Sequence, residues 1–362
     1  MDGQGSAARI GFRNDYSEGA HPRVLQAIVQ ASAEQNAGYG TDRHSERAAA
    51  LIRDAIAQPR AAVHLVVGGT QTNLLAISAF LRPHQAVIAV EAGHIATHET
   101  GAIEATGHKV LTVPALHDKL TPALIAPVLA VHGNEHMVQP RLVYLSNSTE
   151  SGTIYTRAEL EALSRFCRAH DLLLYLDGAR LGAALTANGN DLDLPTIAAL
   201  TDAFYIGGTK NGALLGEALV VIHPDLQADL RYLIKQRGAL LAKGMVLGAQ
   251  FATLFEDGLF FELATHANAM AQRLRAGLLA AGVEFASDSP TNQQFIAVSA
   301  QQAEQLARRY DFERWETRSD GRLVIRFVTS WATTADAVDR LCADVAALMR
   351  DPTLTAVSRI QG

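Results

Sequence analysis

The feature that most constrains the fold of this chain is the alternation of short apolar runs with longer helical patterns. Several runs of β-branched residues and leucine are predicted to form strands: Val63–Val67, Val87–Val90, Leu142–Leu145, Leu172–Leu176, Ala203–Ile206 and Leu219–Ile222. Helical stretches lie between them, among them Asn73–Leu81 and Arg157–His170, and the second follows Thr156 in a capping-box pattern with Glu159. Continuously apolar strands separated by helices indicate a mainly parallel sheet that is covered on both faces. The sequence therefore predicts an α/β fold.

The pattern changes after about residue 245. We expect a long amphipathic helix, two strands and a final helix there: Phe261–Ala281, Phe295–Val298, Leu323–Val328 and Ala335–Met349. At about 100–200 residues per domain, a chain of 362 residues is long enough for two units. We therefore expect an N-terminal arm over 1–20, a large α/β domain over 21–245, and a small C-terminal α+β domain over 246–362. Pro22 is expected near the first turn of a helix.

Composition excludes several classes of function. A hydrophobic content of 48% and a charged content of 19% favour a chain with a sizeable core. The net charge is −6, without a basic block of the kind that nucleic-acid binding requires. No apolar run approaches the ~20 residues of a membrane span, and the first residues carry no apolar signal core. We expect a soluble, cytoplasmic protein without nucleic-acid or membrane partners.

Metal and disulfide sites are not expected either. Cys167 and Cys342 lie too far apart in the sequence to suggest a metal pair or a disulfide framework. His132 and His136 are four residues apart, but Gly133 and Asn134 between them favour a loop.

Ligands of open α/β sheets gather at the carboxyl ends of the strands, so the residues that follow each strand are informative. Val63–Val67 leads into Gly68-Gly69-Thr70-Gln71-Thr72-Asn73 and an apolar helix. Gly69 and Thr70 at such a helix start are suited to binding a phosphate. A glycine turn between strand and helix is also common for structural reasons alone, and this segment has neither the Walker nor the dinucleotide glycine spacing.

Two later strands end in residues that can carry chemistry. Leu172–Leu176 leads into Asp177, which is either a functional carboxylate or the cap of the next helix. Ala203–Ile206 leads into Lys210, which lies among glycines in Gly207-Gly208-Thr209-Lys210-Asn211-Gly212. A desolvated amine of this kind is the usual form of a nucleophilic lysine, and the alternative is a lysine on a surface loop.

The order of these pieces along the chain matches the needs of pyridoxal 5′-phosphate (PLP). This cofactor needs a phosphate site, a carboxylate that keeps its ring nitrogen protonated, and a lysine for the Schiff base. His94 falls between the phosphate turn and Asp177, where it can supply a partner for the face of the ring. Taken alone, His94 would be interpreted as an ordinary surface residue.

With these motifs, the sequence resembles the threonine aldolase and phenylserine aldolase group of the β-eliminating-lyase-like family, which are fold-type I PLP enzymes. The likeness covers nearly the whole chain. It is carried by Phe12-Arg13-Asn14-Asp15, Tyr39-Gly40-Thr41-Asp42, Gly69-Thr70, the His94 segment, Asp177-Gly178-Ala179-Arg180, Thr209-Lys210 and Arg326-Phe327-Val328-Thr329-Ser330-Trp331.

The resemblance implies a role for each matched residue in the cofactor site. Lys210 would form the Schiff base, Asp177 would pair with the pyridine nitrogen, and His94 would stack on the ring. The phosphate would be held by Gly69, Thr70 and Thr209, and Arg180 would also belong to this site.

The resemblance also implies how a small amino-acid substrate is bound. Arg180 and Arg326 would clamp the substrate carboxylate, a task that suits a bidentate guanidinium. Lys235 matches a lysine on the substrate or phosphate side. Asn14 stands where the family has serine, so an amide replaces a hydroxyl at a substrate-binding position. The resemblance implies no metal. It does imply a homodimer or homotetramer, with Tyr39–Asp42 near the active site of the neighbouring subunit.

The expected reaction is the cleavage of a β-hydroxy-α-amino acid, of the threonine or phenylserine type, to glycine and an aldehyde. A PLP-dependent β-eliminating lyase or an aminotransferase would use the same cofactor residues. A non-catalytic phosphate- or nucleotide-binding α/β protein is a more distant alternative.

The base and the preferred substrate depend on a departure from the family. Thr149 falls where many relatives carry a histidine, which removes one base and suggests room for a larger β-substituent. His98 lies four residues after His94 and would share its face if a helix begins there. His98 is then either the base that takes the β-hydroxyl proton or a helix-face residue at a subunit boundary.

Overall fold

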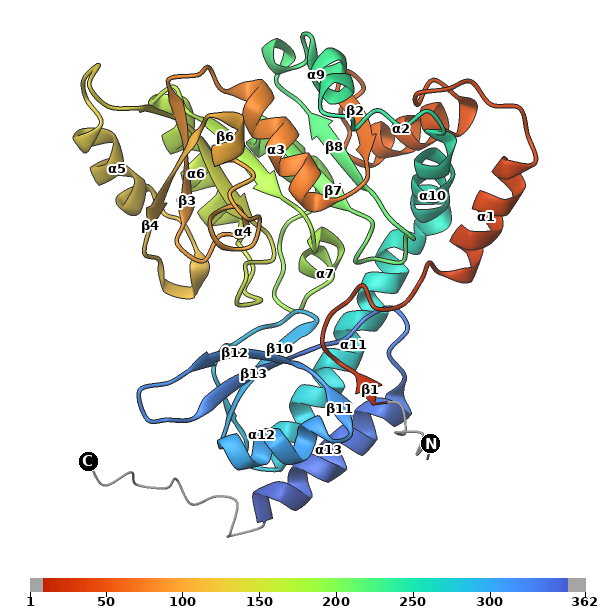
Figure 1. Ribbon diagram of the computed structural model, residues 1–362, viewed down its shortest axis with the longest axis vertical. Helices are drawn as coiled ribbons and strands as arrows, with labels where there is room; N and C mark the ends of the chain where they lie inside the picture. Colours follow the sequence, from red (N-terminus) through yellow and green to blue (C-terminus); the bar gives the residue numbers. More distant parts are fainter. Residues whose placement is uncertain (1–8, 351–362) are drawn as a thin grey trace, which may run out of the picture.

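The large part of the molecule is built on a seven-stranded sheet with helices on both faces, as the computed structural model shows for residues 9–350 (Figure 1). In spatial order the strands are β2 (Ala62–Val66), β8 (Glu217–Val221), β7 (Ala203–Gly207), β6 (Leu173–Asp177), β5 (Gln139–Ser146), β3 (Gln85–Val90) and β4 (Lys109–Val113). All neighbouring strands are parallel except for β8, which is antiparallel to both β2 and β7. The predicted α/β class and the mainly parallel sheet are confirmed.

The helices that cover this sheet include the two that the sequence predicted, Asn73–Leu81 and Arg157–His170, together with others that it did not place. They are α1 (Pro22–Ser32), α2 (Arg43–Ala55), α3 (Gly69–Phe80), α4 (His94–Thr97), α5 (Pro122–Val131), α6 (Arg157–Ala169), α7 (Leu181–Leu185), α8 (Leu194–Leu200), α9 (Leu230–Gln236) and α10 (Met245–Phe255). Pro22 is at the first turn of α1, and the capping box of Thr156 and Glu159 starts α6, as predicted. The helix α3 begins at Gly69 and not at Asn73, so the glycine turn is itself the helix start.

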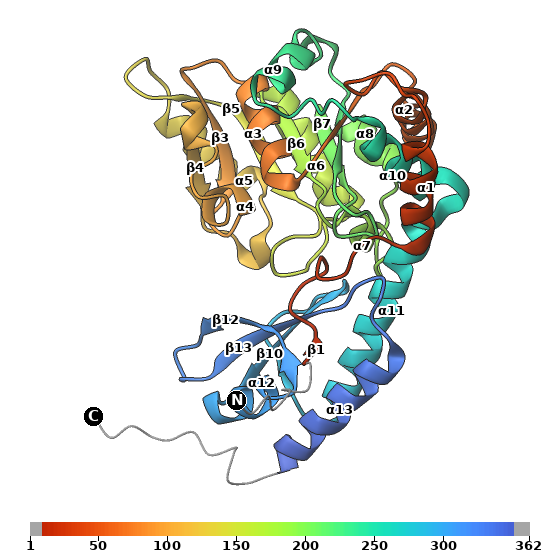
Figure 2. The ribbon, with the colours of Figure 1, turned by 45° about the vertical axis from the view of Figure 1, so that its right-hand side comes forward.

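The C-terminal part contains a four-stranded sheet in the order β12-β13-β10-β9. Its elements are α11 (Leu259–Ala280), β9 (Glu284–Phe285), β10 (Gln293–Val298), α12 (Ala300–Ala307), β12 (Glu313–Thr317), β13 (Leu323–Val328) and α13 (Ala335–Arg350). The long helix α11 extends from the large domain along the whole small domain (Figures 1 and 2). The two predicted strands and both predicted helices are present.

The N-terminal arm packs on this smaller part. Its strand β1 (Ile10–Gly11) pairs in parallel with β11 (Tyr310–Asp311), and Phe12 is fully buried in the same core. We propose 1–20, 21–245 and 246–362 as the division of the chain, with the arm crossing from the last unit to the first. Residues 1–8 of the arm and residues 351–362 of the last unit lie outside the described residues.

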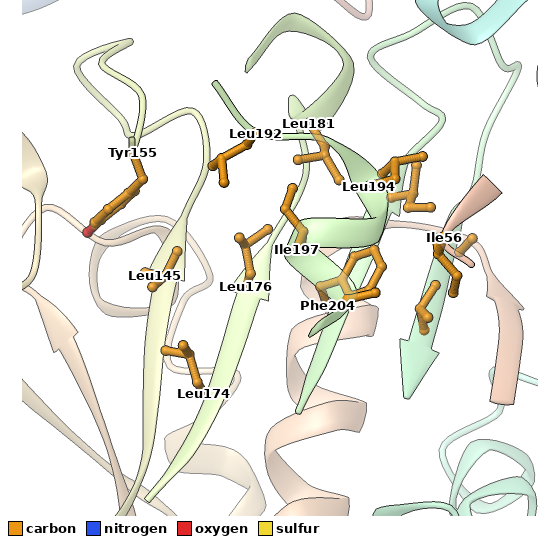
Figure 3. Packing of buried hydrophobic residues seen from close by; sticks show 14 of the residues in the cluster. Ile56, Leu145, Tyr155, Leu174, Leu176, Leu181, Leu192, Leu194, Ile197 and Phe204 are labelled. Carbon is orange, nitrogen blue, oxygen red and sulfur yellow. The ribbon is translucent and has the colours of Figure 1, made fainter. Parts of the chain in front are cut away.

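The core of the large domain lies on both faces of the sheet. On one face Leu145, Leu176 and Phe204 pack against Ile197 of α8 (Figure 3). The alternate residues of the same strands, such as Tyr144, belong to the core on the other face, because successive strand side chains point in opposite directions. Both faces are therefore apolar, which explains the continuous apolar runs in the sequence.

This topology brings several strand ends together above the small domain. Since β2, β3, β5, β6 and β7 are parallel, their carboxyl ends share one edge of the sheet. The helices α4 and α7, which follow β3 and β6, lie on the side that faces the small domain (Figures 1 and 2). Among residues 9–350, no helix is both long and apolar enough to cross a membrane.

Candidate active site

Two adjoining cavities open at this edge of the sheet. The inner cavity is lined by strand-end residues that include Gly69, Thr70, Asp177, Thr209 and Glu217. The outer cavity is lined by residues from the arm, α4 and the small domain, among them His98, Glu313, Trp315 and Arg326. Both cavities share the same five residues: Tyr16, His94, Glu150, Arg180 and Lys210.

Asp177, the last residue of β6, is held rigidly in the inner cavity. Its carboxylate accepts hydrogen bonds from the Tyr144 hydroxyl at 2.6 Å, from Asn73 Nδ2 at 3.0 Å and from the Ala179 backbone N–H at 3.0 Å. Burial, together with the nearby Asp177, raises the pKa of Tyr144 well above its usual value, so this phenol stays a donor. The following helix α7 has Arg180 as its N-cap residue and no side-chain cap. The helix-cap interpretation of Asp177 is therefore wrong.

Lys210 follows β7 and lines both cavities, so the surface-loop interpretation is wrong as well. Its Nζ lies 5.8 Å from the centre of the Tyr16 ring. Burial, with a contribution from the positive charge of Arg180, lowers the pKa of Lys210 below its ordinary value. The lower pKa favours the neutral amine, which is the form that attacks a carbonyl carbon.

The phosphate turn forms the start of α3 in the inner cavity. Gly68 is the N-cap without a side-chain cap, so the first N–H groups of the helix, including those of Gly69 and Thr70, have no partner within it. A Cβ atom at Gly69 would lie 3.1 Å from the Tyr205 hydroxyl, which makes glycine the residue that fits there. Thr209 borders the same cavity, and its Oγ1 accepts a hydrogen bond from the Gly216 N–H at 2.9 Å.

His94 is tied to Asp177 through a buried network. Its Nδ1 lies 2.8 Å from Oε1 of the buried Glu99, and the same oxygen accepts a hydrogen bond from Asn73, which also bonds to Asp177. Burial by itself would lower the pKa of His94, but the hydrogen bond to Glu99, helped by Glu150 and Asp177, raises it above the ordinary value. The imidazole is therefore fixed in orientation where the two cavities meet.

The two arginines expected to bind a carboxylate differ in how free they are. Arg180 is engaged by the buried Asp15 through Nε at 2.7 Å and Nη2 at 3.0 Å. Arg326, on β13, donates from Nη1 to Gln293 at 3.1 Å and stacks 4.8 Å from the centre of the Trp315 ring, while its Nε has no partner among the described residues. Arg326 therefore has more capacity left for a ligand than Arg180.

His98 borders the outer cavity. It is the C-cap of the short helix α4 and is exposed in the outer cavity. Its ring centroid is 5.5 Å from that of His94 and 6.4 Å from that of Trp315. The prediction that the two histidines share a face is confirmed.

Three residues singled out in the sequence line neither cavity. Asn14 accepts hydrogen bonds from the Tyr16 N–H and the Ser17 hydroxyl, so it shapes the turn that presents Tyr16. Lys235, on α9, lies with Nζ 4.3 Å from the centre of the Tyr39 ring, at a separate surface pocket. Thr149 is buried in a turn, with Oγ1 2.8 Å from the Thr153 hydroxyl. The room for a larger substituent cannot come from Thr149, and that part of the argument is wrong.

Sequence reasoning missed several residues that line the cavities. Glu150 borders both cavities, and Glu217 lies at the bottom of the inner one. Trp315 and Glu313 come from β12, an edge strand with a largely polar sequence. Only Glu217 carried a sequence signal, because an acidic residue at the head of the apolar run Ala218–Ile222 has to be explained by burial or function. His132 and His136 lie in a loop, as predicted.

The inner cavity has the groups that a phosphorylated aldehyde cofactor requires. It contains an amine of lowered pKa, a fixed carboxylate and a helix start with free N–H groups. The Ser148 hydroxyl is also buried there and has no hydrogen-bond partner among the described residues. This set fits PLP: Lys210 for the aldehyde, Asp177 for the ring nitrogen, and Gly69 and Thr70 for the phosphate. The fold and these groups define the class of fold-type I PLP-dependent enzymes.

Comparison with known proteins agrees with this class and narrows it. The family model described as "Beta-eliminating lyase" matches residues 12–301. A low specificity L-threonine aldolase of Pseudomonas sp. is 34% identical over 342 residues, which is 93% of this chain and 97% of that protein. The corresponding protein of Pseudomonas aeruginosa is 33% identical over 343 residues, with the same coverage.

Solved structures give the same result. The structure of Leishmania major threonine aldolase superposes with a TM-score of 0.93 at 49% identity, over 94% of this chain and 99% of that one. An aspartate aminotransferase of Thermus thermophilus has a TM-score of 0.71 at 16% identity, over 94% of this chain and 91% of that one, and shows the shared fold alone. The chain belongs to the β-eliminating lyase family and is a PLP-dependent lyase. A non-catalytic phosphate-binding protein is thereby excluded.

Proposed function

We propose that this enzyme cleaves the Cα–Cβ bond of β-hydroxy-α-amino acids, of the threonine and phenylserine type, to give glycine and an aldehyde. The observation that carries the proposal is the pair of adjoining cavities: Lys210 borders both of them, Asp177 borders the inner one, and Arg326 and His98 border the outer one. The matches to threonine aldolases over nearly the whole chain support it.

In this proposal the inner cavity holds the cofactor. When bound, PLP supplies the electron sink into which the bonding electrons of Cα–Cβ are drawn. Lys210 would hold the aldehyde group of PLP, Asp177 would keep a proton on the ring nitrogen, and His94 would supply a partner for the face of the ring. The phosphate is held by three residues of the glycine turns: Gly69, Thr70 and Thr209.

The outer cavity binds the amino acid. Arg326 borders the outer cavity and donates to Gln293 from Nη1, so the rest of its guanidinium takes the substrate carboxylate, and Arg180 contributes positive charge from its place beside Asp15. Fixing the carboxylate selects which bond to Cα is broken. Complete orientation of this kind lowers the activation barrier by on the order of 7 kcal/mol or more. Trp315 keeps Arg326 in place by stacking on its guanidinium.

The β-hydroxyl proton is taken by His98 in this proposal, directly or through a water molecule. His98 borders the outer cavity and lies beside His94. Glu150 borders both cavities and is the alternative acceptor.

A preference for phenylserine over threonine now rests on different residues from those suggested by the sequence. The outer cavity is bordered by the rings of Trp315, His98 and Tyr16. Aromatic side chains favour an aryl substituent through apolar burial and edge-to-face contacts.

A homodimer or homotetramer completes the proposal. Tyr39 and Tyr232 are large side chains that are 44% and 79% exposed, and they border the same surface pocket as Lys235. If a neighbouring subunit covers this pocket, Lys235 and Tyr39 of one subunit come close to the active site of the neighbouring subunit. Unpaired Cys167 and Cys342 are consistent with a cytoplasmic location.

Product analysis tests the proposed function. The PLP-loaded enzyme is incubated with L-threonine, β-phenylserine and L-serine, and glycine, aldehyde, keto acid and ammonia are all quantified. We expect glycine and the matching aldehyde in equal amounts from the first two substrates. Keto acid with ammonia would identify a β-eliminating lyase instead, and transfer of the amino group to an added keto acid would identify an aminotransferase.

A further inference from the structure

Glu217 lies between the two segments that border the phosphate end of the inner cavity. It is the first residue of β8, and its register partners are Val66 at the end of β2 and Gly207 at the end of β7. The chain leaves β2 towards Gly69 and Thr70, and it leaves β7 towards Thr209. Because β8 runs antiparallel to both strands, its starting residue falls at the edge where these two segments meet.

The Glu217 side chain is buried and points into this site. The residue is only 4% exposed, and it lines the inner cavity. Its Oε2 accepts a hydrogen bond from the Gly208 N–H at 3.0 Å. A carboxyl group is therefore built into a place where an anion is to be bound.

The negative charge of a Glu217 carboxylate would not be compensated by its surroundings. The positive charge of Lys210 acts on Glu217, but no ion pair within 4 Å joins the two side chains in residues 9–350. The Asp177 carboxylate from β6 adds negative charge, and Tyr205 from β7 borders the same cavity. Towards α10, the neighbouring Gly216 meets the apolar Leu247 and Phe251, and α3 presents only Gly69 and Thr70 at this end.

Burial, opposed in part by the Thr209 hydroxyl, Lys210 and the Gly208 N–H, raises the pKa of Glu217 to about 8. Near neutral pH the group is therefore a carboxylic acid, which has a proton to donate, whereas above this range it becomes a carboxylate. The two forms have opposite effects on phosphate binding. The carboxylic acid donates a hydrogen bond to the phosphate and favours binding, whereas the carboxylate repels the phosphate.

We propose that Glu217 holds a proton whenever the phosphate of the cofactor is bound, so that binding of the phosphate and protonation of this one carboxyl group are coupled. The inference rests on the proposed function, which places the phosphate at Gly69, Thr70 and Thr209. The phosphate dianion favours the protonated form further, so binding above neutral pH takes up a proton from solution. Cofactor retention then decreases as the pH rises.

The test measures binding and proton uptake without catalysis. Pyridoxine 5′-phosphate, which has no aldehyde and cannot bond to Lys210, is titrated calorimetrically into the full-length apoenzyme between pH 7 and about pH 9.5, in buffers of different ionisation heat. Above the pKa of Glu217, we expect the affinity of the wild type to fall by up to about tenfold per pH unit, with uptake approaching one proton per phosphate bound. Unphosphorylated pyridoxine is the ligand control.

Glu217→Gln keeps a neutral hydrogen-bond donor and should remove this proton uptake and flatten the pH dependence. Glu135→Gln makes the same chemical change at an exposed loop position that borders neither cavity, so it should behave like the wild type. Because Lys210 acts on the ionisation of Glu217, the wild type and Glu217→Gln are also compared in the Lys210→Ala background, where this lysine cannot take up a proton. Equal proton uptake by Glu217→Gln and the wild type would overturn the inference.

Infrared spectroscopy of the wild type alone gives a second readout that does not depend on the folding of a variant. A protonated-carboxyl band should grow when pyridoxine 5′-phosphate binds at about pH 8.5, and a spectrum without this increase contradicts the coupling. A wild type that fails to bind pyridoxine 5′-phosphate even at pH 7 contradicts the phosphate site, and with it the proposed function.

Discussion

The inner and outer cavities adjoin, but they are built in different ways. The inner cavity is lined mainly by residues at the carboxyl ends of β2, β6 and β7, along one edge of the large sheet. The outer cavity is lined by Tyr16 of the arm, the end of α4, and the strands β12 and β13 of the small domain. Apart from Tyr16 of the arm, the inner cavity is formed by the large domain, whereas the outer cavity is formed where three distant segments meet.

The two cavities also differ in how firmly their side chains are held. Asp177 has three hydrogen-bond donors, and His94 is fixed by the buried Glu99. In the outer cavity His98 is exposed, and Trp315 is held mainly by ring contacts with Phe295 and Arg326. We infer that the inner cavity sets the chemistry and that the outer cavity sets the choice among substrates. Substitutions should therefore separate into two kinds: those that affect every substrate alike and those that change the ranking.

The largest effect is expected from Lys210→Ala. Loss of a residue that bonds covalently to the reacting group commonly costs about 10⁴-fold or more in kcat, and the loss should be the same for threonine and phenylserine. The measurement is kcat/KM for both substrates, together with the visible absorption of the PLP-loaded protein. Turnover similar to the wild type would show that Lys210 is not the cofactor lysine.

The fold of this variant should remain intact. Removing a desolvated amine from a cavity takes away no apolar packing, so the thermal unfolding midpoint is expected to stay close to that of the wild type. Lys109→Ala, on the exposed edge strand β4, is the control for loss of a lysine and should keep full activity.

The second effect is expected from Asp177→Asn, which should lower kcat by about 10²–10³-fold for both substrates. An amide has nearly the same shape as the carboxylate, but it cannot stabilise a proton on the ring nitrogen. PLP should still bind, as equilibrium dialysis would show. A variant that changes the threonine-to-phenylserine ratio instead of the overall rate would break the division between the two cavities.

The same division explains how much could be predicted from the sequence. The strands, the glycine turn, Asp177 and Lys210 follow from apolar runs and the residues that end them, because parallel strands place their carboxyl ends together. Trp315 and Tyr16 lie in polar segments with no such pattern, and their place at the site depends on how the arm and the small domain fold back. Asn14 was selected by likeness, whereas the neighbouring Asp15 makes the contact with Arg180.

Trp315→Ala changes a wall of the outer cavity, so it should change the ranking of the two substrates. The loss of an aromatic wall is expected to lower the ratio of kcat/KM for phenylserine to that for threonine by about tenfold, within the range that an apolar pocket provides. Trp315→Phe keeps a ring and should retain most of the preference. KM should rise for both substrates in Trp315→Ala, because Arg326 loses the ring on which it stacks. An unchanged ratio would remove the aromatic wall as the source of specificity.

The smallest effect is expected from His98→Asn. A fully positioned general base contributes about 10²–10⁴-fold, but His98 is exposed, and water can reach the β-hydroxyl in its place, so we expect a loss below that range. The loss should appear in kcat more than in KM. If His98→Asn matches the wild type on both substrates, then His98 is a surface residue at the end of α4.

Glu150→Gln then becomes the deciding variant, because Glu150 borders both cavities. A loss of kcat in Glu150→Gln alone would move the base to the boundary between the cavities, where its removal should affect threonine and phenylserine equally.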